Sequence, residues 1–201
     1  DVCLSRGLGD VYKRQDLLFK DKDACFKLWT GGVFGNVLMT AGMIPFALTL
    51  GFGIAAHITL AAVSAAVYTT IKLMRHESFA ISVTVKSIDC KTLPFVILPI
   101  LLICTLMTNH ILVPTADGGV SSGQSTYGDL QMHLSFVTSI AEQGVFPPKY
   151  CQLSGYNLNY PFLADMLSSS LYLFKTPLRW AVLVPSYVTV SYTHLRAHET
   201  G

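Results

Sequence analysis

The chain has 201 residues, of which 51% are hydrophobic and only 13% are charged, and its mean hydropathy is +0.48. Soluble domains carry about 25% charged residues, so this composition argues against an ordinary soluble domain and, because the apolar residues form long runs, indicates a lipid bilayer. The net charge of +2 gives no reason to expect a nucleic-acid partner, and the cysteines show no CxxC spacing that would indicate a zinc site.

Both ends of the chain read as translated DNA adapter. One DNA sequence that encodes residues 5–15 (SRGLGDVYKRQ) encodes residues 190–199 (VSYTHLRAHE) when its opposite strand is read. That DNA resembles the adapter inserted by transposase-based library preparation. We therefore set aside residues 1–15 and 190–201 as adapter artefact before any fold reasoning, and we expect the stretch between them to be a window of a longer protein.

Three uncharged apolar runs lie within residues 31–113. Residues 31–50 have the length of about 20 residues that a membrane-spanning helix needs, and Gly51-Phe-Gly53 reads as a tight turn. Residues 54–71 form a second run, rich in Ala, Ser and Thr, which let transmembrane helices approach closely. The third run, residues 93–113, is the most apolar. The sequence therefore predicts three transmembrane helices here.

A mostly polar segment, residues 114–160, follows the third run. It contains the Gly/Ser-rich stretch DGGVSSGQSTYGD and then Leu130–Gln143, whose apolar residues recur at helical spacing. We predict that this segment is a long external loop, and that Leu130–Gln143 forms an amphipathic helix lying on the membrane surface.

Residues 161–189 are predicted to supply two more transmembrane helices, the second of them truncated. The basic residues of the short connections then all fall on one side of the membrane, which the positive-inside rule makes cytoplasmic. These residues are Lys20, Lys22, Lys27, Lys72, Arg75, Lys86, Lys91, Lys175 and Arg179. The expected fold is an all-α, polytopic transmembrane helix bundle, with residues 16–30 as a cytoplasmic lead-in and the long loop outside.

Asp129 and His133 are the first candidates for chemistry. They are four residues apart at the start of the predicted surface helix, so they share one helix face. Asp129 follows Gly128 and suits a helix N-cap, whose carboxylate accepts the free backbone N–H groups. The alternative is a catalytic carboxylate with His133 beside it. The two interpretations are compatible if the carboxylate caps only in part.

Asp165 is the third candidate, because it lies one turn into the predicted fourth span. An acid at that depth is costly and marks a functional position unless it stays near the interface, within reach of water. His110 lies near the outer end of the third span and favours an interfacial position. His57, among alanines, is expected to pack against a neighbouring helix.

The segments YGDLQMHLSFVTSIAEQGVFPP and GYNLNYPFLADMLSSSLYLF resemble uncharacterised bacterial polytopic membrane proteins related to the GT-C superfamily of glycosyltransferases. The resemblance implies an enzyme of the plasma membrane that takes a sugar from a polyprenyl-phosphate carrier at the external face. It places Asp129 where the catalytic acid is expected, with His133 beside it. Tyr160-Pro161 falls where the loop returns to the membrane, and Asp165 follows as a substrate-binding candidate. Lys149 is the basic residue available for the carrier phosphate.

The resemblance implies membrane lipid and the polyprenyl-phosphate sugar as partners, and we expect no cofactor and no metal. Two other functions stay open on the sequence alone. A transporter or flippase would use Asp165 and His110 to line a path through the bundle. A non-catalytic membrane scaffold would use the external loop to bind a partner.

Overall fold

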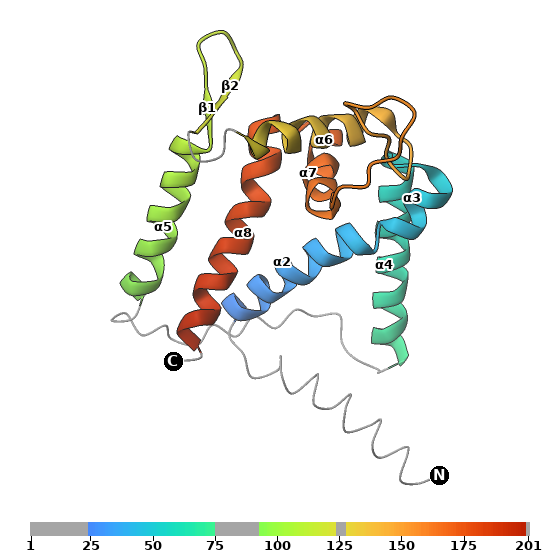
Figure 1. The fold of residues 1–201 in the computed structure, drawn as a ribbon. Coiled ribbons are helices and arrows are strands. Elements are labelled where there is room, and N and C mark those ends of the chain that lie inside the picture. Colours follow the sequence, from blue (N-terminus) through green and yellow to red (C-terminus); the bar gives the residue numbers. More distant parts are fainter. Residues whose placement is uncertain (1–23, 75–92, 124–127, 200–201) are drawn as a thin grey trace.

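The computed structural model describes residues 24–74, 93–123 and 128–199, and these residues are mostly helical (Figure 1). The helices are α2 (Ala24–Ala41), α3 (Ile44–Leu50), α4 (Ile54–Met74), α5 (Leu93–His110), α6 (Asp129–Gln143), α7 (Leu163–Leu173) and α8 (Leu178–Glu199). A short antiparallel hairpin, β1 (Leu112–Pro114) with β2 (Val120–Ser122), departs from the all-α expectation, as does an isolated β-bridge between Lys149 and Asn157. Residues 115–118 form the turn of this hairpin, closed by Gly118 N–H donating to the carbonyl of Thr115 at 3.1 Å, and Gly118 adopts a φ of +84°.

Two stretches of the described chain are long and apolar enough to cross a membrane, Gly31–Leu50 and Ile54–Met74. Only 11% of the first and 17% of the second is buried within the structure. A core helix of a soluble protein would be mostly buried, so the exposed apolar surface favours helices that face lipid. The first two predicted spans thus have the expected length and composition. The predicted third span is shorter than expected, because α5 ends at His110 and the chain then enters β1.

The first candidate span is broken into α2 and α3, where the sequence predicts one continuous helix. Pro45 lies in the first turn of α3, where its missing N–H removes a bond to the preceding turn. Gly42 is required at the break, because a Cβ atom there would lie 2.3 Å from the backbone oxygen of Leu38. The chain resumes its helix when Ala47 N–H donates to the carbonyl of Met43 at 2.8 Å.

The predicted turn at Gly51–Gly53 is confirmed, and it also anchors α6. Gly51 adopts a φ of +76°, which favours glycine. A Cβ atom at Gly51 would lie 2.4 Å from the backbone oxygen of Gly144, the left-handed residue that ends α6. The end of the surface helix is therefore in close contact with the turn that joins the two candidate spans.

The main apolar core lies under α6, at what we call the loop end: the end of the structure that carries the β1–β2 hairpin, α6 and residues 144–162 (Figure 1). Its buried members come from α3, α4, α6, α7 and the segments between them. They are Met43, Ala47, Phe52, Ala56, Leu60, Phe136, Ile140, Leu158 and Met166. The opposite ends of α4 and α5 extend away from this core, with most of their large apolar side chains exposed.

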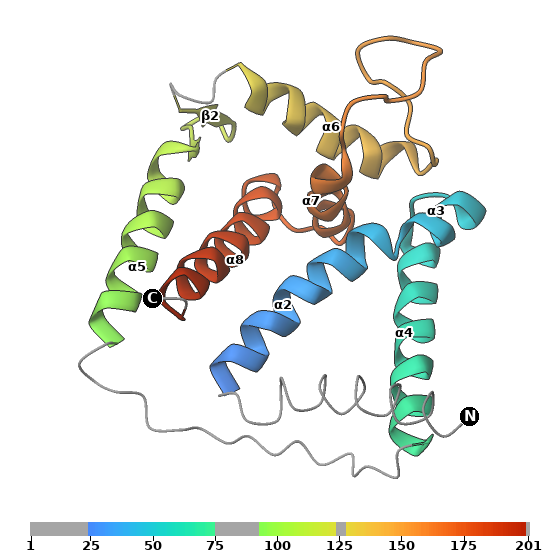
Figure 2. The same ribbon diagram turned by 60° about the horizontal axis from the view of Figure 1, so that its bottom comes forward.

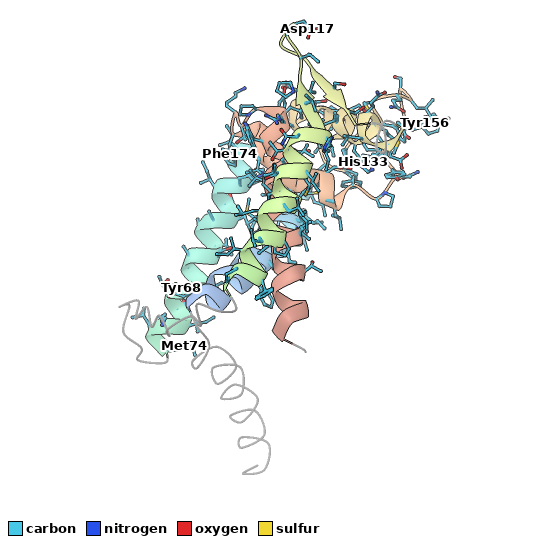
Figure 3. The ribbon with its side chains drawn as sticks, turned by 90° about the vertical axis from the view of Figure 1, so that its left-hand side faces the viewer. Tyr68, Met74, Asp117, His133, Tyr156 and Phe174 are labelled. Atoms are coloured by element: carbon cyan, nitrogen blue, oxygen red, sulfur yellow. The ribbon has the colours of Figure 1, made fainter. Side chains whose placement is uncertain are left out.

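Helix α7 does not cross the structure. Its 11 residues rise about 16 Å at 1.5 Å per residue, which is about half the thickness of a bilayer core. Arg179, just after α7, donates from Nε to the carbonyl of Leu112 and from Nη2 to the carbonyl of Thr108, both at 2.7 Å. Thr108 lies in the last turn of α5 and Leu112 lies just after the helix, so Arg179 lies at the loop end. Figure 3 likewise shows Phe174, which ends α7, on the same side of the molecule as His133.

The predicted orientation of Lys175 and Arg179 is therefore wrong, because both follow α7 at the loop end and not at the opposite end, where Lys72 lies. Arg179 has structural partners that the charge rule does not consider: its guanidinium donates to the carbonyl of Thr108, at the negative end of the α5 dipole, and to the carbonyl of Leu112 in β1. Lys20, Lys22, Arg75, Lys86 and Lys91 lie outside the described residues.

Helix α8 continues through the predicted adapter boundary at residue 190. Ser191, within the stretch set aside as adapter, is 2% exposed in this helix. Once a helix is nucleated, further residues join its end at little cost in free energy. The helical conformation of this stretch therefore does not test whether it is adapter sequence, and the adapter origin stays a prediction. Residues 1–15 lie outside the described ranges.

The placement of the segment after α7 gives a labelling prediction. In a cysteine-free background of the protein in intact cells, Lys175→Cys should react with a membrane-impermeant maleimide, because residue 175 lies at the loop end. Asp117→Cys, at the exposed tip of the β1–β2 hairpin, serves as the positive control. Labelling of residue 175 only after the membrane is permeabilised would contradict this arrangement.

Candidate functional site

The amphipathic helix predicted for residues 130–143 is confirmed as α6, which lies across the ends of the longer helices (Figure 2). Its buried residues are Phe136, Val137, Ile140 and Ala141, and its strongest partner is α7. The apolar face predicted from the sequence therefore packs α6 onto α7 and the core. His133 lies on the same face, one turn before Val137.

His133 and Asp165 are in direct contact across the α6–α7 interface. Nδ1 of His133 lies 3.0 Å from Oδ1 and 2.9 Å from Oδ2 of the Asp165 carboxylate. The side chain of Asp165 is 10% exposed, whereas that of His133 is 34% exposed. When the carboxylate is ionised, Nδ1 must carry a proton and donate it to this pair of oxygens. The neutral imidazole then carries its lone pair on Nε2, the ring nitrogen that does not face the carboxylate.

Burial raises the pKa of the Asp165 carboxyl above its ordinary value, and the hydrogen bond and charge of His133 lower it in part. Helix α7 lies outside both candidate spans, and the surrounding protein shields the group at the loop end. A carboxylate held in this way favours a proton-bearing partner, and His133 is the titratable residue placed to provide one.

Aromatic rings fix the orientation of the imidazole. The ring of His133 meets Tyr160 edge-on at 5.6 Å and Phe136 edge-on at 6.0 Å. Phe136 in turn contacts Tyr150 at 5.7 Å and Tyr160 at 5.7 Å. Edge-to-face contacts of this kind stabilise one ring orientation. The sequence candidates His133, Tyr160 and Asp165 therefore converge on one site.

Asp129 is not part of this cluster. It is the first residue of α6 with Gly128 as the N-cap, so the prediction that its side chain occupies the capping position is wrong. The carboxylate is exposed and makes no hydrogen bond to the described residues, although a negative charge in the first turn is favourable to the helix dipole. His133 is one turn further along α6, but its Nδ1 faces Asp165.

Lys149 also lies away from the His133–Asp165 pair, on the loop that follows α6. Its Nζ donates to Oδ1 of Asn157 at 2.8 Å. The side chain of Gln143 holds the backbone of Lys149 on both sides, accepting from its N–H at 2.9 Å and donating to its carbonyl at 3.1 Å. These hydrogen bonds fix the position of Lys149 on the loop, where it directly precedes Tyr150.

A second histidine contact on α7 was not predicted. His57, at 5% exposure, donates from Nδ1 to the carbonyl of Gly53 at 2.7 Å, and its Nε2 lies 2.9 Å from Oγ of Ser170. The expected packing of His57 against a neighbouring helix is confirmed, with Phe52 and Phe174 edge-on at 5.3 Å. The partner Ser170 is 113 residues away, and only the run of three serines in an apolar segment hinted at a buried polar contact.

His110 is exposed at the end of α5, and the described contacts of Asp165 go to His133 and not to His110. In the described part of the chain, no group of three or more His, Cys, Asp or Glu side chains is arranged to hold a metal ion. Comparison with family models, with curated proteins and with solved structures gives no significant match. The site must therefore be interpreted from its own geometry.

The raised pKa of Asp165 gives a prediction for stability. The carboxyl binds its proton more tightly in the folded protein than in the unfolded chain, whose reference pKa is 3.8. Its contribution to the free energy of unfolding is therefore largest below that value and is lost as the pH rises through the folded pKa. The stability of the wild type relative to Asp165→Asn should fall as the pH is raised from the acid side, measured by unfolding in detergent.

Asp117 provides a control of opposite sign. Hydrogen bonds from Thr115 and the backbone of Gly119 lower the pKa of this exposed carboxyl, so any stability it contributes is lost as the pH falls. The stability of the wild type relative to Asp165→Asn could instead rise with pH, as expected for Asp117. That result would show that the His133 contact outweighs burial, and it would contradict the raised pKa of Asp165.

Proposed function

We propose that this chain is, or belongs to, an integral membrane glycosyltransferase of the GT-C type, which transfers a sugar from a polyprenyl-phosphate carrier to an acceptor hydroxyl at the external membrane face. The observation that carries the proposal is the His133–Asp165 pair, held beneath a surface helix at the loop end. The resemblance of residues 127–174 to GT-C-related proteins supplies the substrate class. The proposed location is the bacterial plasma membrane, in a multi-pass bundle.

The geometry supports His133 as the general base for the acceptor. In the proposed step, Nε2 takes the hydroxyl proton while the acceptor oxygen attacks the anomeric carbon of the sugar. The bond from that carbon to the phosphate oxygen breaks, and the polyprenyl phosphate leaves with the electron pair. Asp165 keeps the proton on Nδ1 and stabilises the imidazolium that forms, which is the role of the acid in any Asp–His pair.

This assignment changes the roles that the sequence suggested. The sequence placed the catalytic acid at Asp129, with His133 as its helper. In the structure the partly exposed His133 has a buried carboxylate as the partner of Nδ1, whereas Asp129 is exposed at the start of α6. We therefore assign catalysis to His133 and positioning to Asp165 and Tyr160. Lys149 remains the candidate for the carrier phosphate.

The location of the pair suits a carrier that is part lipid and part sugar. A polyprenyl chain lies among the acyl tails and its phosphate lies at the level of the headgroups. Because α6 ends against the turn between the two candidate spans and lies across the ends of the longer helices (Figure 2), the proposal sets His133 near the level at which those spans would leave the apolar layer. A general base at this level can reach the sugar of the carrier at the membrane interface.

The proposal predicts a large loss of activity in His133→Ala. With the protein reconstituted in vesicles, release of polyprenyl phosphate from a radiolabelled polyprenyl-phosphate hexose should fall by about 10²–10⁴-fold, the usual contribution of a general base. Asp165→Asn should fall by a similar factor, because an amide that donates to Nδ1 places the ring proton on Nε2. An acceptor alcohol is supplied, and release of the lipid product is measured because the same product leaves whichever hydroxyl takes the sugar.

Asp129→Asn is the matched control, since it lies on the same helix and removes a carboxylate of the same size. It should keep activity within a few-fold of the wild type. Loss of product in Asp129→Asn with normal activity in His133→Ala would return the catalytic role to Asp129. Normal activity in all three variants would contradict the proposed chemistry altogether.

A further inference from the structure

The loop between α6 and α7, residues 144–162, has a buried side and an exposed apolar side. Leu158 is buried in the core, and Phe146, Tyr150 and Phe162 pack against it. Four other apolar or aromatic side chains of this loop are exposed, and together we call them the loop surface. They are Val145 at 43% exposure, Leu153 at 54%, Tyr156 at 63% and Tyr160 at 40%.

This exposure does not come from a loosely held loop. Leu158 N–H donates to the carbonyl of Pro148 at 2.8 Å, and Tyr150 N–H donates to the carbonyl of Tyr156 at 2.9 Å. Gln143 holds the backbone of Lys149 on both sides, as described above. The backbone is thus fixed in a form that turns apolar residues outward, and such exposure marks an interaction surface.

The level of the loop relative to the candidate spans is also fixed. Residue 144 is in close contact with Gly51, in the turn where one candidate span ends and the next begins. The loop starts at this contact. In Figure 3, Tyr156 extends sideways from the helices at the height of α6, whereas Asp117 marks the far tip of the hairpin and Tyr68 and Met74 mark the opposite end.

We infer that the loop surface rests in the headgroup region of the outer leaflet, with Leu153 and Tyr156 among the lipids beside the bundle. Tyrosines with an apolar ring and a polar hydroxyl are suited to this region. Ile54 and Ile58 are exposed at the start of α4, just after the turn that contacts residue 144. The exposed ammonium of Lys149 lies at the polar edge of the loop, where it complements lipid phosphates.

The inference rests on the membrane location in the proposed function, and it adds a role for the loop. A loop seated in the leaflet brings the His133–Asp165 site to the surface from which a lipid-linked sugar would enter, because Tyr160 belongs both to the loop surface and to the surroundings of His133. The occupant of the loop surface is thus the lipid leaflet and not a second protein.

The test places a nitroxide spin label at single cysteines in a background whose native cysteines are replaced by serine. Tyr156→Cys and Leu153→Cys are the test positions, Asp117→Cys is the aqueous control and Tyr68→Cys is the candidate-span control. The protein is reconstituted in vesicles of phosphatidylethanolamine and phosphatidylglycerol. Collision rates with oxygen, which concentrates in lipid, and with a water-soluble nickel chelate are measured by electron paramagnetic resonance.

We expect nickel collisions at positions 153 and 156 to be severalfold fewer than at position 117, and oxygen collisions to be correspondingly more frequent. Nickel access equal to that at position 117 would overturn the inference. Spectral broadening at position 156 that disappears on dilution with unlabelled protein would also overturn it, because a second copy would then cover the surface. The measurement does not depend on sugar transfer, so its outcome is separate from that of the activity test.

Discussion

The contact between His133 and Asp165 is the interaction on which the loop end depends. An acid inside an otherwise apolar and serine-rich helix is unfavourable unless a hydrogen-bonding partner reaches it. His133 reaches it from α6 with both carboxylate oxygens within 3.0 Å. The contact therefore fixes how the surface helix lies on α7. It also fixes which nitrogen of the imidazole remains for chemistry, so structure and proposed function rest on the same pair of side chains.

Helix α7 is held by histidines near both of its ends. His133 binds Asp165 in its first turn, and His57 binds Ser170 near its last, so helices from two different parts of the chain fix one short helix in place. Its buried serines are small enough to let neighbouring helices approach closely. Arg179 then ties the start of α8 to the end of α5. These polar contacts gather the loop end into one unit, whereas the opposite ends of α4 and α5 extend away from it.

Local features of the fold were predictable from the sequence. The turn at Gly51–Gly53, the α4 helix and the amphipathic helix α6 follow from glycine chemistry, from hydropathy and from helical spacing, which act over a few residues. The path of α7 was not predictable, because an apolar run of 14 residues suits both a short buried helix and part of a span. Charge counting placed Arg179 on the wrong side because it cannot recognise a cation that caps a distant helix.

The sequence identified the residues of the candidate site but not the contacts between them. His133, Asp165 and Tyr160 were each identified from the sequence, but the pairing of His133 with Asp165 joins residues 32 positions apart, which spacing along one helix cannot indicate. Asp129 seemed the natural partner because i and i+4 residues share a helix face. Burial decided otherwise, since the buried carboxylate of Asp165 has far more need of a proton donor than the exposed carboxylate of Asp129.

A double-mutant cycle between His133 and Asp165 tests the central claim most directly. The free energy of unfolding is measured in detergent for the wild type, His133→Gln, Asp165→Asn and the double variant. If the two side chains form the contact described, the effects should be non-additive, with a coupling energy of about 0.5–3 kcal/mol. Effects that add to within about 0.3–0.5 kcal/mol, the scatter seen for independent sites, would show that the pair does not hold α6 to α7.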